Sequence, residues 1–120
     1  MLKLLIIVGF LLFASIASAQ TMSVNINRAK LSWNWLPDGA SGPLEKFIMK
    51  CGPSSGNYNR LTDIGPTLRE IAVKDVIGGS GAYFCAIVSA NVFGESLASN
   101  EVPFVAGVAP SGTIVLTVGN

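Results

Sequence analysis

Short stretches of alternating apolar residues, separated by glycine and proline, limit most strongly how this chain can fold. Side chains change sides at every residue of a strand, whereas a helix returns to the same face after three or four residues. The alternation is clearest in Leu31–Trp35, Phe47–Cys51 and Tyr83–Ser89, and shorter pairs are Val24 with Ile26, Ile71 with Val73, and Val102 with Phe104. Turn-forming residues lie between them. The series predicts several short strands and an all-β sandwich.

The first residues have a different character. Lys3 precedes an apolar run from Leu4 to Phe13, and the segment closes with Ala17-Ser18-Ala19. A basic start, a short apolar stretch and an A-x-A site are typical of a secretory signal peptide, here residues 1–19, cut after Ala19. The alternative is a retained membrane anchor, but the run is shorter than the roughly 20 residues of a spanning helix. We expect a secreted or periplasmic protein with no stable membrane span after cleavage.

The charged residues give little support to catalysis. The sequence contains no histidine, so it has neither the usual general base at neutral pH nor a Ser-His-Asp or Cys-His arrangement. Its carboxylates stand singly, without a close pair for glycoside hydrolysis or a ligand-rich calcium loop. A formal net charge of +1 leaves no basic surface for nucleic acid. We expect no enzyme activity, no metal or other cofactor, and no nucleic-acid partner.

An ordered series of motifs resembles the fibronectin type III family. The residues that resemble its strands B and C are Leu31-Ser32-Trp33, the turn to Pro43, and Phe47-x-Met49-x-Cys51-Gly52. Two later segments resemble strand F with the F–G turn, and the start of strand G. They are Tyr83-x-Cys85-x-Ile87-x-Ser89-x-Asn91-x-x-Gly94-Glu95-Ser96 and Ser99–Val102. Ser54–Tyr58 is similar to a variety common in secreted bacterial and phage proteins. The resemblance covers residues 22–106 and implies an immunoglobulin-like antiparallel β-sandwich over residues 20–106.

The resemblance also implies roles for the aromatic residues of the strands. Trp33 matches the core tryptophan of strand B, and Trp35 has the same parity at the strand's end, where it would cap the core. Tyr83 resembles the tyrosine-corner residue, whose hydroxyl bonds to backbone a few residues upstream. Ile77 fits the apolar position that accompanies it.

Cys51 and Cys85 both have the inward parity of their strands. Strands C and F are antiparallel neighbours in the family fold, so the end of one lies opposite the start of the other. Directly opposed residues lie within disulfide reach, and export would place them in an oxidising compartment. We predict a Cys51–Cys85 disulfide, with two buried reduced thiols as the alternative.

The family fold also brings two loops to one end of the domain. These are the B–C loop, Leu36–Leu44, and the F–G turn, Asn91–Glu95. Trp35 borders the first and Phe93 stands in the second, so the pair could contact a sugar ring or a protein partner. The alternative is that both are ordinary surface aromatics.

The C-terminal residues 107–120 lie beyond the resemblance. A flexible connector, Gly107–Gly112, leads to Thr113–Val118, a run of β-branched and apolar residues without charge. Such a run, left exposed, is prone to pair with other strands. It could fold back as an extra strand, pair with a neighbouring copy in self-association, or remain a disordered end.

The sequence therefore predicts a secreted, non-catalytic binding or structural module built on a fibronectin type III-like sandwich. One alternative is a subunit of an extracellular or virion-surface assembly that uses strand addition. Another is a carbohydrate-binding protein.

Overall fold

The structure is a computed structural model that describes residues 21–39 and 42–120. The predicted signal peptide and its cleavage site lie outside these residues. The described elements, in chain order, are β1 (Met22–Asn25), β2 (Lys30–Ser32), β3 (Lys46–Gly52), β4 (Arg60–Ile64), β5 (Glu70–Ala72), the 3-10 turn η1 (Val73–Asp75), β6 (Gly81–Asn91), β7 (Gly94–Glu95) and β8 (Val102–Gly107).

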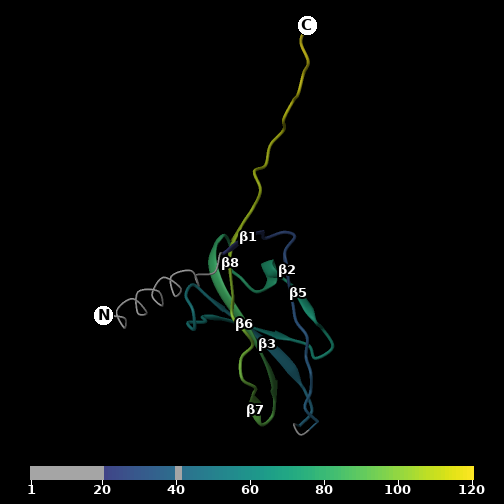
Figure 1. Ribbon diagram of the computed structural model, residues 1–120, viewed down its shortest axis with the longest axis vertical. Coiled ribbons are helices and arrows are strands. Elements are labelled where there is room, and N and C mark those ends of the chain that lie inside the picture. Colours follow the sequence, from purple (N-terminus) through teal and green to yellow (C-terminus); the bar gives the residue numbers. More distant parts are fainter. Residues whose placement is uncertain (1–20, 40–41) are drawn as a thin grey trace, which may run out of the picture.

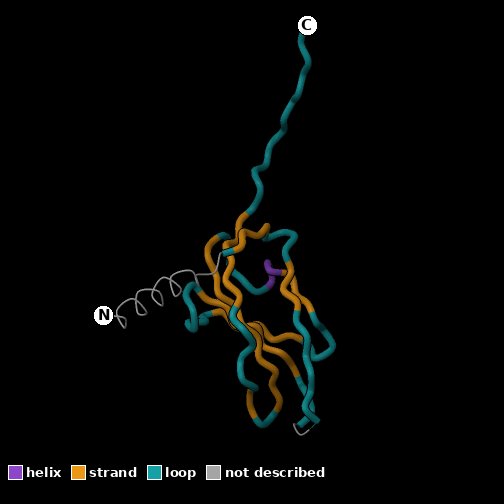
Figure 2. Tube along the Cα trace, viewed as in Figure 1, coloured by secondary structure: helices purple, strands orange, loops and turns teal. Residues whose placement is uncertain are grey.

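The strands form two sheets, as Figures 1 and 2 show. The larger has the order β1-β8-β6-β3-β4, with β7 also paired to β6, and the smaller consists of β2 and β5. Residues of both sheets pack on one apolar core, which confirms the predicted all-β architecture. One pair departs from the expected antiparallel arrangement, because β1 runs parallel to β8 with Met22 opposite Phe104.

The pairing of β3 with β6 places the two cysteines directly opposite each other. Cys51 is the register partner of Cys85, and their Cα atoms are 4.2 Å apart. The two sulfur atoms are bonded, as predicted, and the cysteines are almost completely buried. Cross-linking residues 34 positions apart stabilises the fold by about 3–4 kcal/mol on the chain-entropy model.

The core is built from the inward-facing residues of the alternating stretches. Phe47 lies at its centre, and the rings of Trp33 and Trp35 meet it edge-on, with centroids 5.5 and 6.1 Å away. Both tryptophans are half-buried and pack against the core cluster. The contacts agree with the expected packing role of Trp33 and capping role of Trp35.

Tyr83 makes the contact expected of a tyrosine corner. Its hydroxyl donates a hydrogen bond to the carbonyl of Gly79, four residues upstream, at 2.9 Å. Its ring lies against Phe104, and Ile77 is buried in the same core. This bond ties the connection before β6 to the beginning of that strand.

Two local predictions were incomplete. The alternation of Ile71 with Val73 predicted one strand, but β5 ends at Ala72 and Val73 begins η1, where its side chain is still buried in the core. The edge strand β4 was not predicted, because Leu61 points outward and is largely exposed, so the segment lacks a clear apolar face.

The outer face of the larger sheet carries a second apolar cluster. Ile48 is buried there with Val88 and Ala90, although alternation alone would leave it exposed. Lys50 crosses this face and pairs with Glu95 at 2.7 Å. Long lysine side chains can cover apolar surface while the charged group stays near water.

The C-terminal segment leaves the body of the domain. Residues 108–120 contain no strand and every one of them is exposed, and Figures 1 and 2 show the segment running away from the sheets. The expected extra strand is therefore not formed within this chain. Within residues 21–39 and 42–120, no helix has the length and apolar character to cross a membrane.

The disulfide gives a first expected outcome. Alkylation of the purified, unfolded protein without reductant should add no mass, because both sulfur atoms are already bonded to each other. The mass should rise by two alkyl groups after reduction. Two modified cysteines without reductant would contradict the bond.

A second outcome concerns the aromatic core. Trp33→Ala should lower the free energy of unfolding by about 3 kcal/mol, because it removes a ring packed on Phe47. Phe93→Ala should cost well under about 1 kcal/mol, since that ring is 85% exposed. Denaturant midpoints that fall equally for the two variants would contradict this assignment of core and surface.

Candidate functional site

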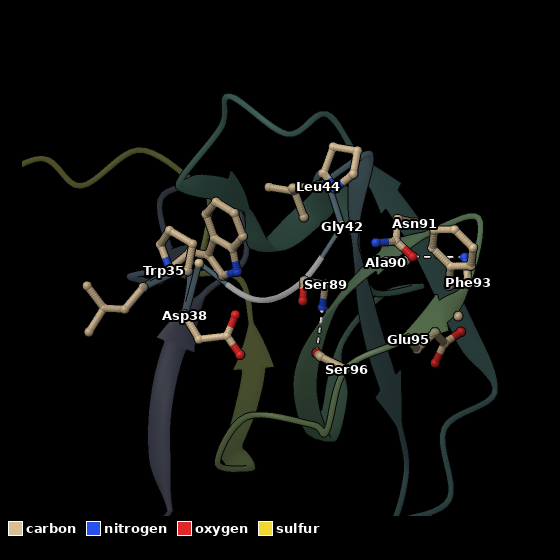
Figure 3. Close-up of a pocket in the computed structure, with 15 residues that line it drawn as sticks. Trp35, Asp38, Gly42, Leu44, Ser89, Ala90, Asn91, Phe93, Glu95 and Ser96 are labelled. Carbon is tan, nitrogen blue, oxygen red and sulfur yellow. Dashed lines mark hydrogen bonds between the residues drawn. The ribbon is translucent and has the colours of Figure 1, made fainter.

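The B–C loop and the F–G turn form one groove at the end of the sandwich, as predicted. Residues from both segments line a cavity of about 750 Å³ between them. Figure 3 shows Trp35 on one side of this groove and Phe93 on the other, with Ser89 and Ser96 between them. Two aromatic residues far apart in the sequence therefore share one surface depression, which we call the loop-end groove.

Trp35 is held firmly at the wall of the groove. Its ring contacts Phe47 in the core, and the guanidinium carbon of Arg69 lies 5.8 Å from its ring centroid. The same guanidinium lies 5.2 Å from the ring centroid of Phe47. Cation–π contacts of this kind restrict a ring's movement. Trp35 thus offers a fixed edge rather than a freely exposed face.

Phe93 provides the exposed aromatic surface. The side-chain oxygen of Asn91 accepts a hydrogen bond from the Phe93 backbone N–H at 2.8 Å, which fixes the turn. Gly94 follows with a φ of +133°, a conformation that favours glycine. A Cβ at Gly42 would lie 3.5 Å from the Phe93 ring, so the ring lies against the opposite loop.

Hydrogen bonds between Ser89 and Ser96 fix the part of the groove between the two aromatic residues. Ser96 accepts a hydrogen bond from the Ser89 N–H through its hydroxyl at 3.0 Å, and its own N–H donates to the Ser89 carbonyl at 2.8 Å (Figure 3). Ser99 binds the backbone of Ile87 in the same way. These side chains replace ladder bonds where the segment before β8 is not a regular strand. Of these residues, only Ser89 and Ser96 line the loop-end groove, and their two hydrogen bonds fix that part of its lining.

The groove combines apolar and polar groups. Asp38, Asn91 and Glu95 supply oxygen and nitrogen atoms beside the aromatic rings, and Glu95 is held by the ion pair with Lys50. In the part of the chain that the structure describes, no three carboxylate or cysteine side chains gather as a metal site. The chemistry available here is stacking, hydrogen bonding and shape.

A second polar cluster lies away from the groove. The Glu101 carboxylate accepts hydrogen bonds from the Tyr58 hydroxyl and, at 2.9 Å, from the Gly56 N–H. Hydrogen bonds from Ser55, Tyr58 and Gly56 hold the pKa of Glu101 below its ordinary value. The bond to Glu101 and burial raise the pKa of Tyr58. The cluster fastens the β3–β4 loop to the start of β8.

Sequence reasoning missed two parts of this arrangement. Arg69 lies next to Trp35 only because the turn before β5 returns to the core, and a single arginine in a turn carries no sequence signal for that contact. The hydrogen bonds that join Ser96 and Ser99 to β6 could be predicted only weakly, from the presence of two serines three residues apart. That spacing opposes a two-residue step in β6, between Ser89 and Ile87.

The chain was compared with known protein families and with curated proteins. No protein-family model matches the chain, and no curated protein matches it.

The Glu101 cluster gives an expected pH dependence. A carboxylate whose pKa is lowered in the folded state stabilises the fold above its ordinary pKa, and this contribution is lost as the pH falls through the lowered value. Glu101→Gln should remove that part of the acid dependence. Melting temperatures measured from neutral pH to below about 4.5 should fall less steeply for the variant. Parallel curves for the two proteins would contradict the assignment.

Proposed function

We propose that this chain is an exported, non-catalytic module of the fibronectin type III type that binds a partner in the loop-end groove. The observation that carries the proposal is the meeting of Trp35 and Phe93 in one groove. Binding residues commonly lie on loops at the end of a rigid sandwich, because the strands hold the loops in place and do not contact the ligand themselves.

Several features support membership in that family. The antiparallel pairing of β3 with β6, the disulfide between them, and the Tyr83–Gly79 bond are those expected from the resemblance. The two-sheet arrangement with Trp33, the residue directly after β2, packed on the core is a further point of agreement. A fold supports many functions, so the binding role depends on the groove itself.

Export is supported by the sequence and by the cysteines. The signal-like residues 1–19 would direct the chain out of the cytoplasm, and a disulfide persists in an oxidising compartment. The sequence has no histidine, and the carboxylates of the groove stand beside aromatic and amide groups, which favours recognition over catalysis.

The groove suits a ligand that offers both a flat apolar face and hydrogen-bonding groups. A sugar ring stacked on Phe93 has these properties, and so does a short peptide loop with an apolar tip. The 85% exposure of the Phe93 ring means that a ligand would remove a large apolar area from water.

Binding to a glycan array, together with capture of labelled proteins from the producing cells' surface, tests the proposal. Phe93→Ala should abolish binding while leaving the melting temperature nearly unchanged. Leu97→Ala is the matched control, because Leu97 is equally an exposed apolar residue but does not line the groove.

Loss of a glycan signal with Phe93→Ala alone would identify a carbohydrate ligand, and loss of a protein signal would identify a protein partner. Binding that survives Phe93→Ala, or that both substitutions weaken equally, would overturn the role of the groove.

A further inference from the structure

A second groove lies along the edge of β2 that faces away from β5. It has a volume of about 660 Å³ and is lined by Leu31 and Trp33 on one side and by Ile87 and Val102 on the other. No residue of β5 itself lines it, although Arg69, directly before β5, does; Ser99, Asn100 and Val102 extend it toward the start of β8. We call it the β2-edge groove.

The backbone of β2 is ready to accept another strand on that side. Leu31 is the register partner of Ile71, and the Trp33 N–H donates to the Arg69 carbonyl at 3.0 Å. The backbone groups of Leu31 and Trp33 therefore bond to β5 and to Arg69 directly before it. The backbone groups of Lys30 and Ser32 point the opposite way. Among the described residues, β5 is the only strand that pairs with β2.

The position of β1 explains why this edge is open. β1 pairs with β8 in the larger sheet, so it does not extend the smaller sheet beside β2. The indole N–H of Trp33, in the wall of the groove, is buried without a hydrogen-bond acceptor in the described part of the chain.

The C-terminal segment has the pattern of a strand with one apolar face. Its even-numbered side chains are all aliphatic, whereas its odd-numbered ones are mostly threonine; the two sets are Ile114, Leu116, Val118 and Thr113, Val115, Thr117. The aliphatic set is more than nine-tenths exposed in the single chain. An alternating, uncharged segment of this kind is suited to the half-buried side of a sheet.

We propose that the segment Thr113–Val118 of one copy of this chain adds as a strand to the β2-edge groove of a second copy, with Ile114, Leu116 and Val118 facing inward. The chain itself favours a second copy over folding back. The end of β8 is fixed by a hydrogen bond from the Ile26 N–H to the Gly107 carbonyl at 2.8 Å, and the segment beyond it leads away from the body.

Donor and acceptor lie on different parts of the same molecule, so the contact joins copies head to tail. Each added copy brings a new free segment and a new free groove, which allows chains of subunits to grow. The connector before Thr113 spans up to about 20 Å when extended, enough to separate neighbouring domains. This inference is independent of the loop-end groove and its ligand.

Sedimentation velocity of the purified protein over a range of concentrations tests the proposal. The parent protein should form dimers and longer species as concentration rises. Leu116→Lys should weaken association at least about tenfold, because a lysine would have to enter a groove that Arg69 and the apolar Leu31, Ile87 and Val102 help to line. Val115→Lys is the matched control, since it lies on the outward face of the same strand and should associate as the parent does.

The acceptor is tested by a second matched pair in β8. Val102 and Val105 are 39% and 42% exposed, and only Val102 lines the β2-edge groove. Val102→Lys should abolish association with the melting temperature of the monomer nearly unchanged, whereas Val105→Lys should leave association intact.

Mixing separates the two halves of the contact. Leu116→Lys keeps its groove and Val102→Lys keeps its donor segment, so each alone should be a monomer and their equimolar mixture should be a dimer that grows no further. A parent protein that stays monomeric at all concentrations overturns the proposal. So does a lower melting temperature for Leu116→Lys than for the parent protein when both are dilute enough to be monomers, which would place the segment in its own groove.

Discussion

The antiparallel pairing of β3 with β6 is the interaction on which the rest of the structure depends. β6 bonds on its other side to β8 and β7, and β3 bonds to β4, so this pair holds the larger sheet together. A register shift of one residue would turn Phe47 and Cys51 outward. The disulfide at Cys51 and Cys85 secures the correct register covalently. The core, and the tryptophans that rest on Phe47, follow from that one alignment.

The same pair of strands positions both surfaces with functional interest. One end of β6 leads into the turn that carries Phe93, and the middle of β6 lines the β2-edge groove at Ile87. The larger sheet is well paired, whereas the smaller has only two strands. Among the described residues this leaves one edge of β2 open, and the same chain carries an uncharged, exposed aliphatic segment. Proteins usually avoid such exposed pairing surfaces unless they use them.

Much of the strand arrangement could be predicted from the sequence, because inward parity is visible wherever a strand has one buried face. The inward parity of Cys51 and Cys85 was predicted on that ground, and the backbone bond of Tyr83 was predicted from the resemblance. The burial of Ile48 could not be predicted from alternation, because it lies on the outer face of the larger sheet, where it packs with Val88 and Ala90. The meeting of the two loops was predicted from the family fold, but the fixed position of Trp35 was not, because it depends on the tertiary contact with Arg69.

Amide hydrogen exchange on the full protein, measured residue by residue at low and high concentration, tests the central claim most directly. The account predicts slow exchange in β3 and β6 at both concentrations. It predicts fast exchange at Lys30, Ser32 and residues 114–118 in the dilute protein. As copies associate, it predicts protection of Lys30 and Ser32 together with alternate residues of 114–118, because only every second residue of an added strand bonds to its neighbour. Exchange in β3 and β6 as fast as at the edges, or edge protection that does not change with concentration, would contradict it.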